Sequence, residues 1–373
     1  MRRKIKNICC IILMFILTGC TSENKAEEFN IPQYIAINHD FYGNGLIYPQ
    51  EWRKAYFLDF DTMNRAPLCA VPNCDHKTAN CLTNSLGNTP VMYNNHAYFF
   101  GTKADVVEKK GKSEFHMESK LYRASLDSST IEFICEFNDA LVRDGEGYVL
   151  LGNKLYFIAF DPDAQDNGYG GFPWSTAGGY DYLCSIDLDS GNYTNHGLIC
   201  YVEDEYPSAD HTATAKILGC DNEQLYIGYS FAKWYPEHGD TGEEDLQWEQ
   251  YNFTFSFVTQ ELQQSNLPYA AYVDADYYIY YEDESHFTVI QNGEARHFTG
   301  QISEISAPVY NGKIFGLQHW YDLADGSEHS LGKYIVSDDD EWHCVAYYDG
   351  CYIFQQYTGT FEKLTEDELL SLQ

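Results

Sequence analysis

Basic residues are scarce in this chain. Its 373 residues include 23 Lys and Arg against 56 Asp and Glu, which gives a formal net charge of -33 at pH 7. Such an acidic body repels nucleic acid and anionic membrane surfaces, so we expect no nucleic-acid partner. Aromatic residues make up 16% of the sequence, which leaves enough apolar mass to build a hydrophobic core.

Long apolar runs are missing as well. The N-terminal run from Ile8 to Leu17 has only ten residues, about half of what a membrane-spanning helix needs. It follows a basic start with Arg2 and Arg3, which is typical of an export signal. The run ends in Leu17-Thr18-Gly19-Cys20, which resembles the lipobox of bacterial lipoproteins. An ordinary secretory signal with a chance cysteine is the alternative.

The lipobox resemblance implies cleavage just before Cys20 and attachment of a diacylglyceryl group to its sulfur. Two acyl chains, such as palmitate, anchor a protein stably without a transmembrane helix. We therefore expect a lipoprotein signal peptide at 1–19, the lipidated cysteine and a flexible tether at 20–30, and a single domain at 31–373. The expected location is the extracytoplasmic face of the cell membrane, and the membrane is the expected partner of the lipid.

Sequence motifs with a catalytic mechanism are absent. The chain contains neither G-x-S-x-G nor H-E-x-x-H, and it lacks the Ser-x-Asp-x-Gly-x-x-Trp turn of propeller glycosidases. Gly111-Lys112-Ser113 resembles the end of a phosphate-binding loop, but Val106 stands where that motif requires glycine. We therefore expect a protein that is not an enzyme.

What the chain does contain is a repeated hairpin pattern. A short apolar run, a turn rich in Asn, Asp or Gly, and a second run with Tyr or Phe recur along the sequence. Asn311-Gly312 and Asp349-Gly350 are strong two-residue turn signals, because both central positions of a type I′ turn have positive φ. The seven copies are FYGNGLIY (41–48), VMYNNHAYFF (91–100), YVLLGNKLYFI (148–158), ILGCDNEQLYIGY (217–229), AYVDADYYIYY (271–281), VYNGKIFG (309–316) and VAYYDGCYIF (345–354).

Several of these hairpins are followed by a further strand that ends in an acidic or polar turn, so each repeat reads as four antiparallel strands. Repeated four-stranded sheets with almost no helical periodicity between them predict an all-β protein of the β-propeller class. Seven blades fit the seven hairpins, and six blades with an irregular last unit are the alternative. A strand from Tyr34 to Ile37 is the candidate for closing the ring. The spacing Thr365 to Glu368 predicts a short capped helix at the C-terminus.

Long connections in three consecutive repeats are predicted to be loops on one face of the propeller, at 101–119, 160–181 and 230–250. Loops on a rigid scaffold commonly carry binding sites, so this face is the predicted binding surface for a glycan or a surface protein. An alternative is that these aromatic side chains fold back onto the blades as small satellite cores. The candidate anchors are Tyr169, Phe172, Trp174, Tyr180, Trp234, Tyr235 and Trp248.

A cysteine-rich loop, CAVPNCDHKTANC (69–81), follows the first repeat. Cys69, Cys74, His76 and Cys81 provide the four soft ligands that a structural zinc site needs. Their spacing, C-x4-C-x-H-x4-C, is looser than that of the usual zinc knuckle. A disulfide from Cys81 to Cys69 or Cys74 is the second possibility in an exported protein, and free thiols are the third.

At this loop the chain resembles a group of bacterial surface lipoproteins with TolB-like, tyrosine-rich propeller repeats. In that group a Leu-Cys pair, Pro-x-Cys-x-His and a later cysteine follow the first blade. Leu68-Cys69, Pro72 to His76 and Cys81 match these positions. The resemblance implies a propeller and brings no activity with it, so a membrane-anchored binding protein is the expected function. An extracytoplasmic hydrolase or lyase with catalytic residues from different blades is the alternative.

Overall fold

The computed structural model describes the strands and most turns of the chain. All of the described residues fall in one compact unit, Ile31–Gln373. The predicted signal peptide, Cys20, the tether and the Tyr34 to Ile37 strand lie outside them. None of the helices in the described part has the length and apolar character that crossing a bilayer requires. The described residues are 40–41, 45–50, 54–77, 81–85, 90–109, 112–126, 130–137, 141–142, 147–160, 181–199, 212–234, 246–283, 285–300, 309–310, 312–315, 319–330, 343–348, 351–356 and 361–371.

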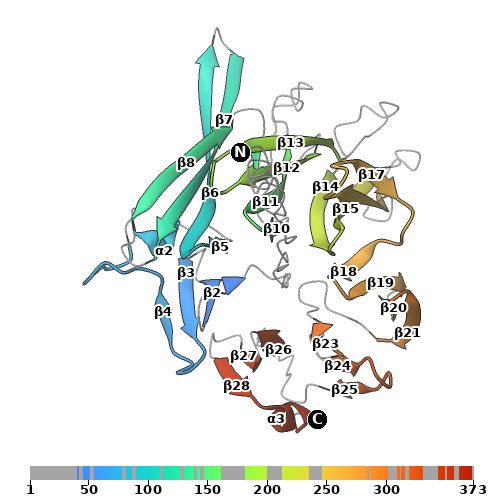
Figure 1. The fold of residues 1–373 in the computed structure, drawn as a ribbon. Helices are drawn as coiled ribbons and strands as arrows, with labels where there is room; N and C mark the ends of the chain where they lie inside the picture. The colour runs from blue at the N-terminus through green and yellow to red at the C-terminus, as the bar shows by residue number, and fades with distance from the viewer. Residues whose placement is uncertain are drawn as a thin grey trace, which may run out of the picture. The chain divides into compact units, whose positions relative to one another are not determined.

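The described strands form six sheets in which most strands pair with their neighbours in the chain (Figure 1); β9 pairs with β11, and β14 pairs with β18. Sheet A contains β1 (Asp40–Phe41), β2 (Gly45–Gln50), β3 (Lys54–Asp59) and β4 (Arg65–Pro67), and sheet B contains β5 (Val91–Tyr93), β6 (His96–Lys109), β7 (Lys112–Ser125) and β8 (Ile131–Phe137). Sheet C contains β9 (Leu141–Val142), β10 (Tyr148–Leu151), β11 (Lys154–Phe160), β12 (Asp181–Asp187) and β13 (Tyr193–Leu198). The short helix α2 (Leu82–Ser85) lies between sheets A and B in the sequence.

Sheet D has eight strands and consists of two antiparallel halves. Half D1 contains β14 (Thr212–Cys220), β15 (Gln224–Trp234), β16 (Leu246–Ser256) and β17 (Leu262–Ser265), and half D2 contains β18 (Ala270–Val273), β19 (Tyr277–Asp283), β20 (His286–Gln291) and β21 (Glu294–Thr299). A single parallel pairing, Gly219 with Val273, joins them. Sheet E contains β22 (Val309–Tyr310), β23 (Lys313–Phe315), β24 (His319–Asp322) and β25 (Glu328–Ser330), and sheet F contains β26 (His343–Tyr348), β27 (Cys351–Gln356) and β28 (Phe361–Leu364).

The all-β class and the repeated hairpins are confirmed. The β5–β6 turn has Asn94 at φ 46° and Asn95 at φ 63°, which are the two positive φ values that a type I′ turn requires. In the last hairpin Tyr348 pairs with Cys351 and Cys344 pairs with Gln355. That register separates the two cysteines by four positions along the ladder, too far apart for a disulfide.

The predicted C-terminal helix is also confirmed as α3 (Glu366–Leu370). Its capping box is complete, because the Glu368 backbone N–H donates to Thr365 Oγ1 and the Thr365 N–H donates to Glu368 Oε2. Such reciprocal bonds satisfy two backbone donors that would otherwise lack partners at the start of a helix.

Aspartates at the strand ends have a structural task that accounts for part of the acidic composition. Asp59 Oδ1 accepts from the Thr62 N–H at 2.8 Å, and Asp187 Oδ1 accepts from the Ser190 N–H at the same distance. These backbone donors hold the pKa of both carboxyl groups below their usual range. The ionised carboxylates therefore cap the turns that join β3 to β4 and β12 to β13.

Apolar side chains from neighbouring sheets form shared cores all along the chain. Sheets A and B share Ile47, Leu68, Leu82 and Phe99; B and C share Tyr98, Leu121, Tyr148 and Phe157; C and D1 share Val149, Tyr156, Ile227 and Phe255. D1 and D2 share Leu218, Tyr226, Val273 and Tyr278; D2 and E share Ile279, Phe287, Ile314 and Tyr321. Burial of each such side chain stabilises the fold by about 1.5–3 kcal/mol.

The last sheet contacts both the sheet before it and the first sheet. The rings of Phe315 in sheet E and Tyr352 in sheet F lie 5.7 Å apart. Ile353 of sheet F is buried with Leu46 and Leu58 of sheet A. The series of shared cores therefore returns to the sheet where it began.

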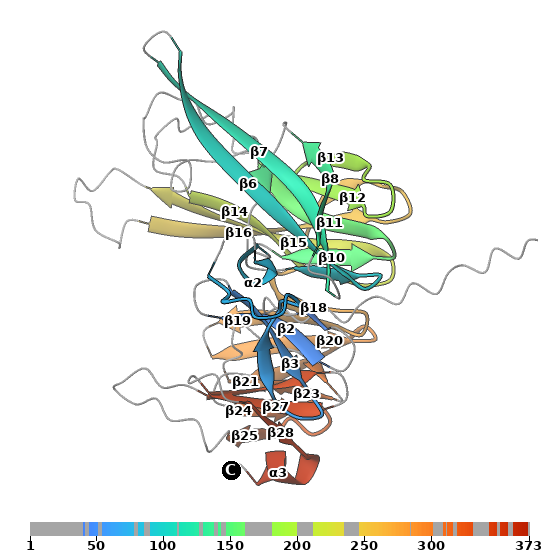
Figure 2. The same ribbon diagram turned by 90° about the vertical axis from the view of Figure 1, so that its left-hand side faces the viewer.

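One of the three predicted long loops is largely strand, and a second is strand at both of its ends. The segment 101–119 continues β6 and β7, whose ladder extends from His96↔Ser125 to Lys109↔Lys112. Figure 2 shows both strands continuing beyond β8, which pairs with β7 only between Ser119 and Ala124. The loop prediction was wrong because this connection pairs with itself as a two-stranded ribbon, in which oppositely charged residues such as Lys103 and Glu118 occupy cross-strand positions.

The loop prediction for 230–250 is wrong at both ends of the segment, because β15 extends to Trp234 and β16 begins at Leu246. Residues 161–180 and 235–245 lie outside the described part of the chain. The positions of the insertions in the strand order agree with the prediction. Each joins the second and third strands of its repeat, in the hairpins β6–β7, β11–β12 and β15–β16.

Gly219 permits the close approach of D1 to D2, and a substitution there should be severe. Its φ is 149°, and a Cβ at this position would overlap the carbonyl oxygen of Val273. We predict that Gly219→Ala lowers the free energy of unfolding by about 3 kcal/mol, measured by urea titration. Gly293→Ala is the matched control, because its φ is also positive but a Cβ there meets nothing within 4 Å, so that it should cost only about 1 kcal/mol. Equal losses in the two variants would contradict this account of the D1–D2 junction.

Candidate functional site

The cysteine-rich segment brings its four predicted ligands together. Cys69, Cys74 and His76 follow β4, and Cys81 immediately precedes α2. One ligand atom from each residue lies within 4.8 Å of the other three. Cys74 Sγ is 3.6 Å from Cys81 Sγ, and His76 Nδ1 is 3.5 Å from Cys81 Sγ. We call these four residues the Cys3His cluster.

Backbone geometry shapes the segment around this cluster. Asn73 and His76 adopt left-handed conformations, with φ of 58° and 53°. Left-handed residues reverse the chain direction within a few positions, which brings ligands from a short segment onto a common point. The Asn84 side-chain amide donates to the His76 carbonyl oxygen at 3.0 Å and so ties the two arms of the loop together.

Both ends of the segment are fixed in the core shared by sheets A and B. Leu68 and Leu82 are buried there with Ile47 and Phe99, and the Leu68 N–H donates to the Ala55 carbonyl oxygen at 3.0 Å. Cys81 is itself only 4% exposed. The Cys3His cluster is therefore attached to the fold at both of its ends.

The pKa values of the Cys81 and Cys74 thiols shift in opposite directions. Burial opposes ionisation of Cys81, but hydrogen bonds from His76, Thr83 and the two other thiols outweigh it and lower the Cys81 pKa to about 6. At Cys74 the backbone N–H of His76 favours the thiolate, but burial and the neighbouring Cys81 and Cys69 raise the pKa above its usual value. Cys81 is thus more readily ionised near neutral pH than Cys74.

Thr83 places a buried hydroxyl beside the cluster. The residue is completely buried, and its Oγ1 makes no well-aligned hydrogen bond within the described residues. The hydroxyl lies near enough to Cys81 to lower the pKa of that thiol. A thiolate at Cys81 would be a stronger acceptor for this hydroxyl than the neutral thiol is.

The chemistry of the cluster is that of three sulfurs and one imidazole nitrogen. Four such donors fill a tetrahedral coordination shell and leave no position for substrate or water. The three sulfurs are not joined to one another or to other cysteines in the described part of the chain.

The aromatic residues predicted to bind ligand are only partly described. Trp234 ends β15 and Trp248 lies in β16, where the register pairs Trp234 with Leu246 and Ala232 with Trp248. Tyr169, Phe172, Trp174, Tyr180 and Tyr235 lie outside the described residues, as does the lipidation candidate Cys20.

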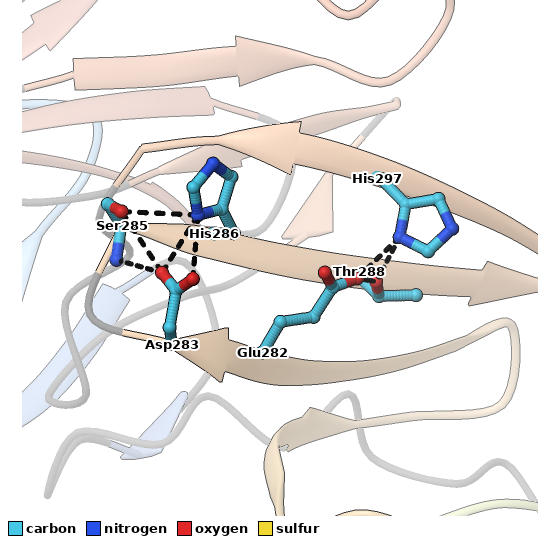
Figure 3. Close-up of polar contacts among 6 residues, drawn as sticks. All are labelled: Glu282, Asp283, Ser285, His286, Thr288 and His297. Carbon is cyan, nitrogen blue, oxygen red and sulfur yellow. Dashed lines mark hydrogen bonds and ion pairs between the residues drawn. The ribbon is translucent and has the colours of Figure 1, made fainter.

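A polar cluster on β19, β20 and β21 was missed by the sequence analysis (Figure 3). Asp283 Oδ1 and Ser285 Oγ lie 2.8 and 3.1 Å from the same His286 nitrogen, Nδ1. A nucleophilic triad requires the acid and the hydroxyl on opposite ring nitrogens, so these three residues do not form one. The only sequence signal for this group was the histidine directly after the run Glu282 to Ser285.

Glu282, Thr288 and His297 make up the second half of this cluster, and they do not form a nucleophilic triad either. Glu282 Oε1 and Thr288 Oγ1 both contact His297 Nδ1. The side chains of Glu282 and His297 are 37% and 68% exposed, and exposed ion pairs contribute only about 0–1 kcal/mol. Hydrogen bonds from Thr288 and His297 lower the pKa of Glu282, whereas the Ser285 N–H and His286 lower that of Asp283 to about 2. These contacts link neighbouring strands and supply no activated nucleophile.

Comparison with known proteins yields structural likenesses without a family. No family model and no curated protein matches the sequence. Solved structures that align with the chain include β-propeller proteins. An oligogalacturonate lyase in complex with manganese is 12% identical, with 87% of this chain and 75% of that chain covered and a TM-score of 0.33. BamB from Moraxella catarrhalis is 11% identical, with 88% and 81% covered and a TM-score of 0.36.

A DUF4623 family protein from Bacteroides eggerthii is 11% identical, with 87% of this chain and 70% of that chain covered and a TM-score of 0.31. The three likenesses include an enzyme and BamB, and their scores are too low to carry an argument about activity.

Proposed function

We propose that this protein is a lipid-anchored β-propeller that binds a glycan or a protein partner outside the cytoplasm. Seven blades account for the six sheets, because the eight-stranded sheet D contains two four-stranded runs, D1 and D2. The burial of Ile353 with Leu46 and Leu58 supports a closed ring, since it joins sheet F to sheet A. Sheet F has three described strands, and the segment Tyr34 to Ile37 is the candidate for its fourth.

The observation that carries the binding proposal is the pair of strand hairpins that outgrow their sheets. From Lys112 to Glu118, β7 pairs with β6 and with no other described strand, because β8 pairs with β7 only between Ser119 and Ala124. β16 continues to pair with β15 up to Trp234↔Leu246, whereas β17 stops pairing at Asn252↔Ser265. A two-stranded ribbon is marginally stable in water. Because these extensions add little to stability, we infer that they serve binding. Both extensions lie at the connection between the second and third strands of their repeats.

Within the β15–β16 hairpin, the register favours Trp234 and Trp248 as anchors. Their paired positions, Trp234↔Leu246 and Ala232↔Trp248, are two residues apart along the ladder. Positions two apart belong to the same face of a ribbon, so the two tryptophans occupy diagonal positions on one face. Two aromatic side chains in this arrangement suit a sugar ring or an apolar protein segment.

A binding assay with the full-length chain in detergent tests this proposal. We predict that cell-wall material or a glycan array retains the protein, and that Trp234→Ala with Trp248→Ala weakens retention about tenfold or more, because central aromatic anchors dominate binding energy. Phe133→Ala is the matched control, since Phe133 is 55% exposed on β8 and lies outside this hairpin. Retention unchanged by the double substitution would refute the anchor assignment. Ligand converted to product during the assay would instead support the hydrolase or lyase alternative.

The membrane anchor has a separate test. Because the lipobox resemblance assigns the lipid to Cys20, metabolic palmitate labelling should be lost completely in Cys20→Ser, and the protein should move from the membrane fraction to the soluble fraction. Cys10→Ser is the matched control, because Cys10 lies within the predicted signal peptide. Labelling that persists in Cys20→Ser would contradict the anchor.

A further inference from the structure

We propose that the Cys3His cluster binds one Zn²⁺ ion, with Cys69, Cys74 and Cys81 as thiolate ligands and His76 bound through Nδ1, and that this ion holds sheets A and B together. This inference is independent of the proposed binding function, because it concerns the segment between the first two sheets. The sequence left a zinc site, a disulfide and free thiols open, and this inference selects the zinc site.

The distances within the cluster are those of a tetrahedral zinc site. With Zn–S bonds of about 2.3 Å and a Zn–N bond of about 2.0 Å, tetrahedral geometry places two sulfurs about 3.8 Å apart and a sulfur and a nitrogen about 3.5 Å apart. The observed separations are 3.6 Å for Cys74 Sγ to Cys81 Sγ and 3.5 Å for His76 Nδ1 to Cys81 Sγ. All four ligand atoms lie within 4.8 Å of one another, so side-chain shifts of about 1 Å would bring each of them to bonding distance of a single ion.

The donor set selects the metal. Calcium and magnesium require oxygen ligands, whereas three thiolates and an imidazole favour a soft or borderline ion. Zinc is redox-inert, accepts the tetrahedral geometry without strain and commonly occupies sites of the Cys3His type. Because all four positions belong to the protein, the site is structural and has no place for a substrate.

Three features show that the surroundings suit an ion. Asn73 and His76 are both held in left-handed conformations. The Asn84 amide fixes the carbonyl of His76, which restrains the position of that ligand. The Thr83 hydroxyl is buried beside Cys81 without a well-aligned partner in the described residues. Groups that donate hydrogen bonds to metal-bound ligands are a regular part of such sites, and Thr83 occupies that position.

The role of the ion follows from where the loop is attached. Leu68 precedes the first ligand and Leu82 follows the last, and both are buried in the core shared by sheets A and B. The ion therefore clamps the connection from β4 to β5 at the junction of two sheets. Its removal should loosen this junction first and leave distant junctions intact.

The direct test is the metal content of the purified full-length chain. After purification without chelator under reducing conditions, elemental analysis should find about one equivalent of zinc per chain. His76→Ala and Cys74→Ser should each lower this content at least fivefold. Cys135→Ser should retain it, because Cys135 is a partly exposed cysteine on β8 outside the cluster. Cobalt substituted into the wild-type protein should show the strong visible absorption of a tetrahedral thiolate site.

A second measurement on the wild-type chain avoids any dependence on how the variants fold. Zinc removal by chelator should lower the melting temperature by roughly 5 °C, and zinc addition should restore it. Hydrogen exchange should then quicken in β3 and β5, whereas β19 and β20 should keep their protection.

Several results would overturn the inference. One is a Cys69–Cys81 or Cys74–Cys81 disulfide in the metal-free protein purified without reductant. Others are free thiols that take up no zinc when it is added, bound iron in place of zinc, or zinc that survives both ligand substitutions. Unchanged hydrogen exchange at β3 and β5 after complete zinc removal would overturn the clamping role.

Discussion

The structure depends on the burial of apolar faces between consecutive sheets. A single four-stranded antiparallel sheet exposes two faces and two edges, so its apolar face has to be covered by another layer. Here the aromatic and aliphatic residues on each sheet form a core with the next sheet from A through E, the rings of Phe315 and Tyr352 join E to F, and Ile353 packs with Leu46 and Leu58 of sheet A. Each sheet thus stabilises its neighbours. Gly219 allows the closest of these approaches, since a side chain there would meet the backbone of Val273.

The remaining features are additions to this series of cores. Aspartates such as Asp59 and Asp187 cap the turns between strands, so part of the negative charge serves local structure. The Cys3His cluster closes the connection between sheets A and B, where Leu68 and Leu82 already enter a shared core. The two long hairpins extend beyond their sheets, because β6–β7 and β15–β16 continue to pair where the fourth strands have stopped.

The repeats could be predicted from the sequence because their turns have strict conformational requirements. Asn94 and Asn95 both need positive φ, which few other residues tolerate, so their position fixed the hairpin register. The β6–β7 extension was misread because its charged residues resemble a loop when the partner strand is unknown. The four residues of the Cys3His cluster were recognised by type, but their separation depends on left-handed turns at Asn73 and His76 that no spacing rule predicts. The Glu282–His297 contact was missed because it joins residues on different strands.

A double-mutant cycle at the junction of sheets F and A tests the central claim most directly. Leu46→Ala and Ile353→Ala should each lower the free energy of unfolding by about 2–5 kcal/mol. If the two residues share one core, their effects should be non-additive by roughly 0.5–3 kcal/mol. Leu46→Ala combined with Ile314→Ala is the control, because Ile314 belongs to the core between D2 and sheet E; that pair should be additive within about 0.5 kcal/mol. Additivity of Leu46 and Ile353 would mean that the first and last sheets do not support each other, and the closed series of cores would be wrong.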